Sequence, residues 1–125
     1  MYTPYLTAGE YAALGGSIPA AERERYLENA SRHIDSLTFN RIVEQGFDNL
    51  SAFQQEIVKK VCFDMANFEY DNADALKSVL SGYAINGVSM QFGSGMNVAS
   101  VGGITVRRDT YETLIQTGLC YRGLP

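Results

Sequence analysis

A long stretch without charge divides this chain of 125 residues and limits the structures that it can form. Between Ser78 and Val106 there is no Lys, Arg, Asp or Glu, although charged residues are frequent on both sides. Asn86, Gln91, Asn97 and several glycines interrupt the stretch, so it lacks the roughly 20 predominantly apolar residues of a membrane-spanning helix. We therefore expect no membrane segment here. We expect an uncharged, conformationally permissive segment between helical segments, with a surface that could pair with another molecule.

Length and composition predict one globular domain that covers residues 1–125. Apolar residues make up 46% of the chain and charged residues 19%, which is compatible with a single core and not with general disorder. The net charge is −4 and the longest basic run is Arg107-Arg108, which disfavours tight nucleic-acid binding because that depends on Lys and Arg neutralising phosphates. No secretory signal is recognisable, and two cysteines make no disulfide framework, so we expect a reduced, cytosolic setting.

Capping motifs and apolar periodicity predict the helices. A capping box at Thr7–Glu10 begins a short helix that ends near Leu14, and Pro19 precedes a second helix over residues 20–37. The second helix has a polar side that includes Asp35. Its apolar stripe, expected to face the core, is formed by Tyr26, Leu27, Ala30, Ile34 and Leu37.

Three further helical segments are predicted downstream. Residues 39–43 form a short helical turn, and a second capping box at residues 51–54 begins the longest helix, which ends near Asn72. A cap at Asp109 begins a final helix that runs to about Thr117 and is ended by Gly118.

The longest helix is apolar on two sides. Phe63 and Tyr70 project roughly 120° or more away from the centre of its main stripe. Such a helix is either central in a bundle, which is the favoured interpretation, or shared with a neighbouring subunit. The main stripe is formed by Phe53, Ile57, Val61, Met65 and Phe68.

A β-hairpin is predicted over residues 82–92, around the pair Asn86-Gly87 that favours a type I′ turn. A lone hairpin is marginal in water, so this one needs support from the bundle or from another chain. Residues 93–103 are expected to be a mobile loop, residues 103–106 a short extended piece, and residues 119–125 an irregular tail. The alternating hairpin side chains are Tyr83, Ile85, Val88, Met90 and Phe92. The fold class is therefore mainly α, a small bundle of about four helices with a hairpin and a Gly-rich loop before the last helix.

The sequence predicts no catalytic, cofactor or metal site. Gly93-Ser94-Gly95 lacks the third glycine of a dinucleotide-binding motif, and the segment from Gly82 lacks the lysine of a phosphate-binding loop. His33 is expected to be structural, and Cys62 to be a small buried apolar residue. Two alternatives remain open: a small cytosolic enzyme that uses Cys120 or His33, and a helical nucleic-acid-binding module.

Five segments, in order along nearly the whole chain, resemble a known family. They are YLTAGEYAALGG near the N-terminus, ASRHIDSLTFNRI from Ala30 to Ile42, LSAFQQEIVKKVCFDMANF from Leu50 to Phe68, SGYAINGVSMQFG from Ser81 to Gly93 and YETLIQTGLCYRGLP at the C-terminus. Together they resemble the head–tail connector proteins of long-tailed bacteriophages and prophages, also called adaptor or head-completion proteins.

The resemblance implies a non-enzymatic helical bundle without a cofactor, whose copies form a ring, expected to be a dodecamer, in the virion after assembly in the host cytoplasm. The ring would join the portal to a stopper or tail-completion protein and let DNA pass without specific binding. We expect contacts between copies at Phe63, Tyr70 and the five alternating hairpin residues. Docking to the portal or to the next ring is expected at Leu119, Tyr121 and Leu124.

Overall fold

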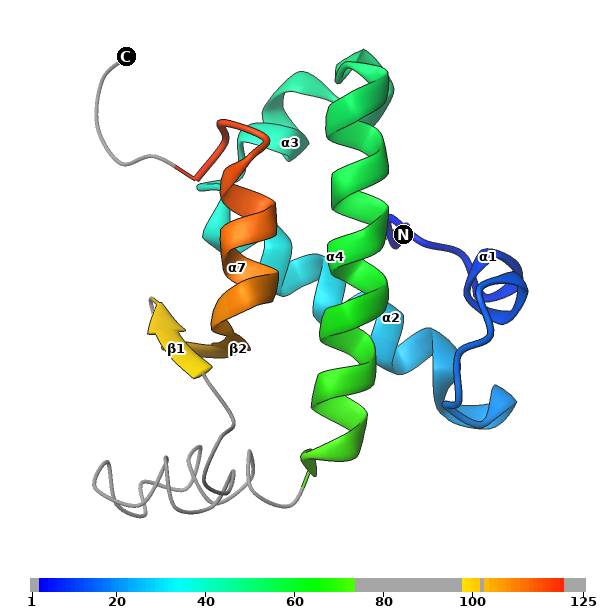
Figure 1. The fold of residues 1–125 in the computed structure, drawn as a ribbon. Helices are drawn as coiled ribbons and strands as arrows, with labels where there is room; N and C mark the ends of the chain where they lie inside the picture. Colours follow the sequence, from blue (N-terminus) through cyan, green and yellow to red (C-terminus); the bar gives the residue numbers. More distant parts are fainter. Residues whose placement is uncertain (1–2, 74–97, 102, 121–125) are drawn as a thin grey trace.

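The computed structural model describes residues 3–73, 98–101 and 103–120 (Figure 1). In these residues the fold is mainly helical with one small antiparallel hairpin, which confirms the predicted fold class. The elements are α1 (Ala8–Ala13), α2 (Ala20–Leu37), α3 (Arg41–Gln45), the 3₁₀ turn η1 (Phe47–Asn49), α4 (Ala52–Asp71), β1 (Val98–Val101), β2 (Ile104–Arg107) and α7 (Arg108–Ile115).

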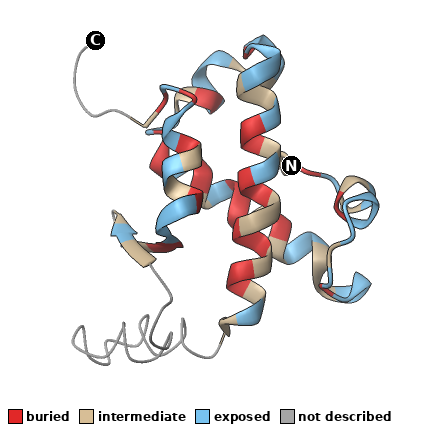
Figure 2. Cartoon of the chain, viewed as in Figure 1, coloured by how far each residue is buried: buried red, intermediate tan, exposed pale blue. Residues whose placement is uncertain are grey.

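Helix α4 is the centre of the molecule. It crosses α2, and its other side meets α7 and β2 (Figure 1). The buried residues are concentrated where α2, α4 and α7 lie together (Figure 2). A central position explains why α4 is apolar on more than one side, as the favoured interpretation of its sequence predicted.

At the start of α4 the predicted capping box is present, but the predicted burial of the first apolar residue is not. The Ser51 side chain accepts from the Gln54 N–H at 3.1 Å, and the Gln54 side chain accepts from the Ser51 N–H at 3.0 Å, which completes the predicted capping box. Phe53, predicted to be in the core-facing stripe, is 56% exposed. The first turn of α4 extends beyond the core, so the stripe is buried only from Ile57 onward.

Helix α2 has the predicted bounds, but one residue of its polar side is buried. Asp35 is 7% exposed and accepts a hydrogen bond from the Tyr5 hydroxyl. The Tyr5 N–H also donates to the Ser31 Oγ at 3.0 Å. The segment before α1 therefore covers this side of α2 and supplies the donor that a buried carboxylate needs.

Helix α1 begins at the predicted capping box, in which Thr7 and Glu10 bond each other's backbone N–H groups. Tyr11 is fully buried, and its hydroxyl bonds the Asn67 side chain and accepts from the Ile18 N–H at 3.0 Å. The chain turns tightly over this ring at Gly16, where a Cβ atom would lie 1.9 Å from the ring. Gly16 is thus required by close approach, and the packing of Tyr11 places α1 beside α4.

The observed hairpin lies later in the chain than the predicted one. β1 pairs antiparallel with β2, and the register sets Val98 opposite Arg107 and Val101 opposite Ile104. Residues 98–101 were expected to belong to a mobile loop, but they form a strand. They pair with β2, which includes most of the predicted extended piece, and β2 packs on α4 and α7, which supports the hairpin. The predicted hairpin over residues 82–92 lies outside the described residues.

Helix α7 begins at Arg108, one residue before the predicted cap. The position before the helix is Arg107, and the Asp109 carboxylate accepts from the Thr110 N–H within the first turn. The cap position therefore lies two residues before the predicted one, a difference that is ordinary at a helix end. The helix ends at Ile115, two residues before the predicted end near Thr117, and Gly118 closes the turn that follows with a φ of 77°.

Candidate interaction surface

Within the described residues, α4 borders a pair of grooves that differ in chemistry. The first, called here the apolar groove, runs between α1 and α4 and has a volume of about 610 Å³. Its apolar lining is formed by Leu6, Ala13, Leu14 and Phe63. Its charged rim is formed by Glu10, Glu56, Lys59, Lys60 and Asp64.

Contacts between α1 and α4 hold the apolar groove in shape. The Lys59 ammonium lies 2.5 Å from the Glu10 carboxylate, and this hydrogen bond lowers the pKa of Glu10. Below that pair, the Tyr11 and Phe63 rings meet with their centroids 5.1 Å apart. The groove is therefore formed by two elements that are tied by an ion pair at the rim and by aromatic packing at the floor.

The two predicted interface residues of α4 are seven positions apart, so they lie on the same side of the helix, about two turns from each other. Phe63 is half-buried against Tyr11 and lines the apolar groove, where its remaining surface is accessible. Tyr70 is half-buried against Tyr26 of α2, edge to face, with centroids 5.4 Å apart. Each ring has an aromatic partner within the same chain, and its contact with a neighbouring copy stays a prediction.

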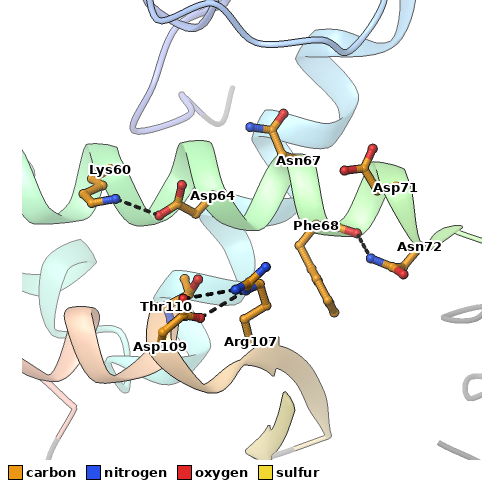
Figure 3. A pocket seen from close by; sticks show the side chains of 9 residues that line it. All are labelled: Lys60, Asp64, Asn67, Phe68, Asp71, Asn72, Arg107, Asp109 and Thr110. Atoms are coloured by element: carbon orange, nitrogen blue, oxygen red, sulfur yellow. Dashed lines mark hydrogen bonds and ion pairs between the residues drawn. The ribbon is translucent and has the colours of Figure 1, made fainter. Parts of the chain in front are cut away.

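The second groove is polar and lies between α4 and the junction of β2 with α7; its volume is about 470 Å³. Figure 3 shows Lys60 bonded to Asp64 along α4, facing the pair formed by Arg107 and Asp109 across the groove. Both pairs have N–O distances of 3.1 Å. Arg107, the first residue of the basic dipeptide, is thus paired locally with Asp109. The remaining lining residues are Asn67, Phe68, Asp71, Asn72 and Thr110.

Several large apolar side chains are exposed on the surface of the described residues. Phe39 is 44% exposed, Val43 59% and Ile115 46%, in addition to Leu14 and Phe53. The elements around α3 are joined to the end of α7, since the Arg41 guanidinium donates to the Leu119 carbonyl at 2.9 Å. Single exposed apolar residues are normal, so their placement rather than their number is informative.

Phe39 is exposed in a backbone conformation that disfavours it. Its N–H donates to the Ser36 carbonyl at 3.2 Å, and the Asn40 N–H donates to the Asp35 carbonyl at 2.7 Å. This is a Schellman motif with Phe39 at the left-handed position after the helix, where glycine is usual. With a φ of 55°, Phe39 carries a strain of roughly 1–2 kcal/mol that glycine would not carry.

The Phe39 ring is also held in place from one side. The Arg41 guanidinium lies over it, 5.2 Å from the ring centroid. The sequence prediction used Phe39 only as the start of a helical turn and missed its exposure. The sequence has no glycine after this helix, and Asn40 is a residue type that adopts the left-handed conformation more often than most. Nothing in the local sequence shows that Phe39 adopts the left-handed conformation as well.

The predicted docking residues are only partly described. Leu119 is 5% exposed and belongs to the core, so in this structure its side chain packs within the bundle. Tyr121 and Leu124 lie outside the described residues, as do the hairpin residues Tyr83, Ile85, Val88, Met90 and Phe92. Their proposed contacts stay predictions.

The residues of the enzyme alternative have environments that do not suit a nucleophile. Cys62 is fully buried beside Ser31, and burial raises its pKa to about 11. Burial also raises the pKa of Cys120 to about 11. At pH 7 both sulfurs are thiols, whereas the thiolate is the reactive form. His33 pairs with Glu69, a contact between α2 and α4.

Comparisons of the chain with protein-family models, with curated proteins and with solved structures found no match. Among the described residues, His, Cys, Asp and Glu form no group of three that would hold a metal ion. In the same residues, no helix combines the length and apolar character that crossing a membrane requires.

Proposed function

We propose that this chain is a structural subunit of a phage head–tail connector, whose copies form a ring between the portal and the stopper or tail-completion protein. The ring extends the DNA channel during head completion and head–tail joining. The support from the sequence is the order of five family-like segments along nearly the whole chain.

One structural observation carries the proposal. Large apolar side chains are exposed at two separate places, the apolar groove beside α1 and the surface around α3, and Figure 1 shows these elements on different sides of α4. Closed rings are formed by heterologous contacts, in which one patch of a copy meets a different patch of the next. A subunit with two unlike apolar places fits that requirement.

Charge supports the proposed channel. Each copy carries a net charge of −4, so a ring of copies is acidic and repels the phosphates that pass through it. The same charge disfavours the nucleic-acid-binding alternative, because such binding requires cations that neutralise phosphates. The raised pKa values of both cysteines, about 11, disfavour the enzyme alternative.

Electron microscopy of DNA-filled heads tests the proposal. Heads from a phage that lacks this chain are incubated with the purified protein, and a ring is expected on the portal vertex, together with retained DNA and restored tail attachment. Heads without portal are the control and should bind no ring. Particles that lack the chain but keep their genomes and acquire tails at the normal frequency would refute the proposal.

A further inference from the structure

The apolar groove beside α1 is open to solvent and has one unpaired carboxylate at its rim. Leu14 is 58% exposed, and Phe63 is only half-buried. The two lysines of the rim are each paired with a carboxylate, whereas Glu56 is exposed and has no ion-pair partner within the described residues. A segment that complements this groove therefore carries apolar side chains beside a cation.

Most cations of this chain already have an interaction. Of the ten Lys and Arg residues, Lys77 and Arg122 lie outside the described residues. The others, each of which has an interaction in the structure, are Arg23, Arg25, Arg32, Arg41, Lys59, Lys60, Arg107 and Arg108. Any of these would have to share or give up that interaction in order to pair with a second carboxylate.

The sequence around Arg122 has the composition that the groove requires. Tyr121 precedes it, Leu124 follows it by two positions, and no acidic residue lies within the nine positions before it. Lys77 differs, because it follows Asp74 by three positions and so has a carboxylate close in sequence. Two large apolar side chains thus lie next to a cation that no carboxylate of the preceding sequence matches.

We propose that residues 121–124 of one copy, called here the tail segment, bind in the apolar groove of the next copy. The apolar side chains of the tail segment pack against Leu14 and Phe63, and its Arg122 guanidinium pairs with the Glu56 carboxylate. Aromatic and apolar side chains that fill a pocket supply most of the binding energy of an interface, and charges at the rim give it specificity. The inference specifies the contact between copies, and so it rests on the proposed function.

Helix α7 and the groove lie on opposite sides of α4, which places the contact between different copies. Gln54 faces α7, because its Nε2 donates to the Thr117 carbonyl at 2.9 Å. Glu56 is two residues further along α4, about 200° around the helix, on the side of α1 (Figure 1). Arg122 is only two residues beyond Cys120, a backbone reach of about 7 Å, whereas α4 with its side chains is roughly 10–12 Å wide. The contact is therefore heterologous and can be repeated from copy to copy.

Charge reversal tests the ion pair. Glu56→Arg and Arg122→Glu each set two like charges against one another, so ring formation on heads and self-association in sedimentation should weaken roughly tenfold. An equal mixture of the two variants should assemble as the wild type does, since each tail segment then meets a groove of opposite charge on the other variant. Glu24→Arg is the matched control: Glu24 is exposed and does not line the groove, so its reversal should leave assembly unchanged. Circular dichroism checks that each variant is folded.

The apolar part of the contact is tested with Ala13→Glu, which places a carboxylate in the lining of the groove. Ala12→Glu is the matched control, since Ala12 is exposed on the same helix and does not line the groove. Ala13→Glu should weaken assembly, whereas Ala12→Glu should not. Equal assembly by these two variants would overturn the contact.

The mixture separates a contact between copies from one within a copy. A tail segment that bound its own groove would stay mismatched in the mixture, so a mixture that assembles no better than the single variants would overturn the proposal. Loss of portal attachment by Arg122→Glu with unchanged self-association would assign the tail segment to the portal and would also overturn it.

Further outcomes separate this contact from the proposed function. Single variants that form rings as the wild type does would overturn the contact and leave the ring function intact. Wild-type protein that forms no ring on heads, but whose self-association is weakened by each reversal and restored by the mixture, would overturn the function and leave the contact. Wild-type protein that neither forms rings nor self-associates would overturn both.

Discussion

At the scale of single residues, close packing decides which positions of this chain tolerate change. Gly16 is the third residue after α1 and has no side chain because the Tyr11 ring occupies that space, whereas Phe39 is the second residue after α2 and is large in a conformation that favours glycine. Neither requirement can be read from helix or turn propensity alone. At Gly16 the Tyr11 ring decides which residue fits, and at Phe39 the left-handed backbone is strained for any residue but glycine.

Replacing Gly16 by Ala should lower the free energy of unfolding by about 1–3 kcal/mol, because the added methyl group meets the Tyr11 ring and forces its displacement. Chemical denaturation monitored by circular dichroism measures the change. Gly9→Ala is the control: its Cβ would lie 4.0 Å from the nearest atom, and alanine favours the helix, so stability should rise by about 0.5–1 kcal/mol. Equal effects of the two substitutions would contradict the close approach at Gly16.

A second residue-scale prediction concerns His33, the only histidine of the chain. Its Nδ1 lies 2.5 Å from the carboxylate of Glu69, whose side chain is 9% exposed, and this hydrogen bond raises the pKa of His33. A raised pKa means that the folded state binds the proton more tightly than the unfolded state. The resulting stabilisation is complete below the unfolded value of about 6.5 and is lost as the pH rises through the folded value.

The unfolding free energy should therefore fall between about pH 6 and pH 8, by roughly 0.2–1 kcal/mol, since His33 is 40% exposed and partly screened. Urea unfolding at several pH values measures the slope. His33→Gln keeps a donor for Glu69 but does not titrate, so its slope should be flatter in this range. An unchanged slope in His33→Gln would show that other groups cause it.

At the scale of elements, a capping residue of α4 both begins its helix and bonds a second element. Gln54 completes the capping box of α4, and its Nε2 also donates to the Thr117 carbonyl at 2.9 Å, which ties the start of α4 to the end of α7. The capping box was predictable from four consecutive residues. The bond to Thr117 joins residues 63 positions apart and required the fold.

Ser51→Ala should therefore cost about 1 kcal/mol of stability, because the Gln54 N–H loses its acceptor. Thermal unfolding followed by circular dichroism measures the loss. Ser51→Asp is the matched control, since aspartate is an equally good residue at this cap and should retain most of the stability. If Ser51→Ala were as stable as the wild type, the capping box would not contribute to the fold.

At the scale of the whole molecule, the core of the described residues draws on most of their helices and strands. Its buried members come from α1, α2, α3, α4, β2, α7 and the segments beside them. Deleting residues 84–91, which are expected to pair with another copy, should leave a folded, helical protein with a similar unfolding temperature, but one that no longer joins portal-containing heads. Circular dichroism and electron microscopy test the two halves of this prediction.

A less drastic variant supports the same test. Val88→Lys places a charge in the stretch that lacks charge, and it should impair assembly without altering the helical core. Normal assembly of both variants would remove the hairpin from the contact between copies. Loss of the helical fold in the deletion would show instead that this stretch supports the bundle.

The sequence by itself determined the helices, because their causes are local. Capping boxes at residues 7–10 and 51–54, and a stripe over residues 20–37, set the bounds of α1, α4 and α2 to within a residue or two. Amphipathic periodicity also located most of the core, since a side chain at helical spacing must face the same neighbour.

Only the tertiary structure decided which side chains depart from the burial that helical periodicity predicts. Phe53 is exposed because the core ends before it, and Asp35 is buried because Tyr5 covers it. Residues 98–101 became a strand by pairing with β2, which no local pattern shows. The groove beside α1 and the exposed ring of Phe39 likewise depend on how separate elements approach one another, and that approach is a property of packing and not of neighbouring residues.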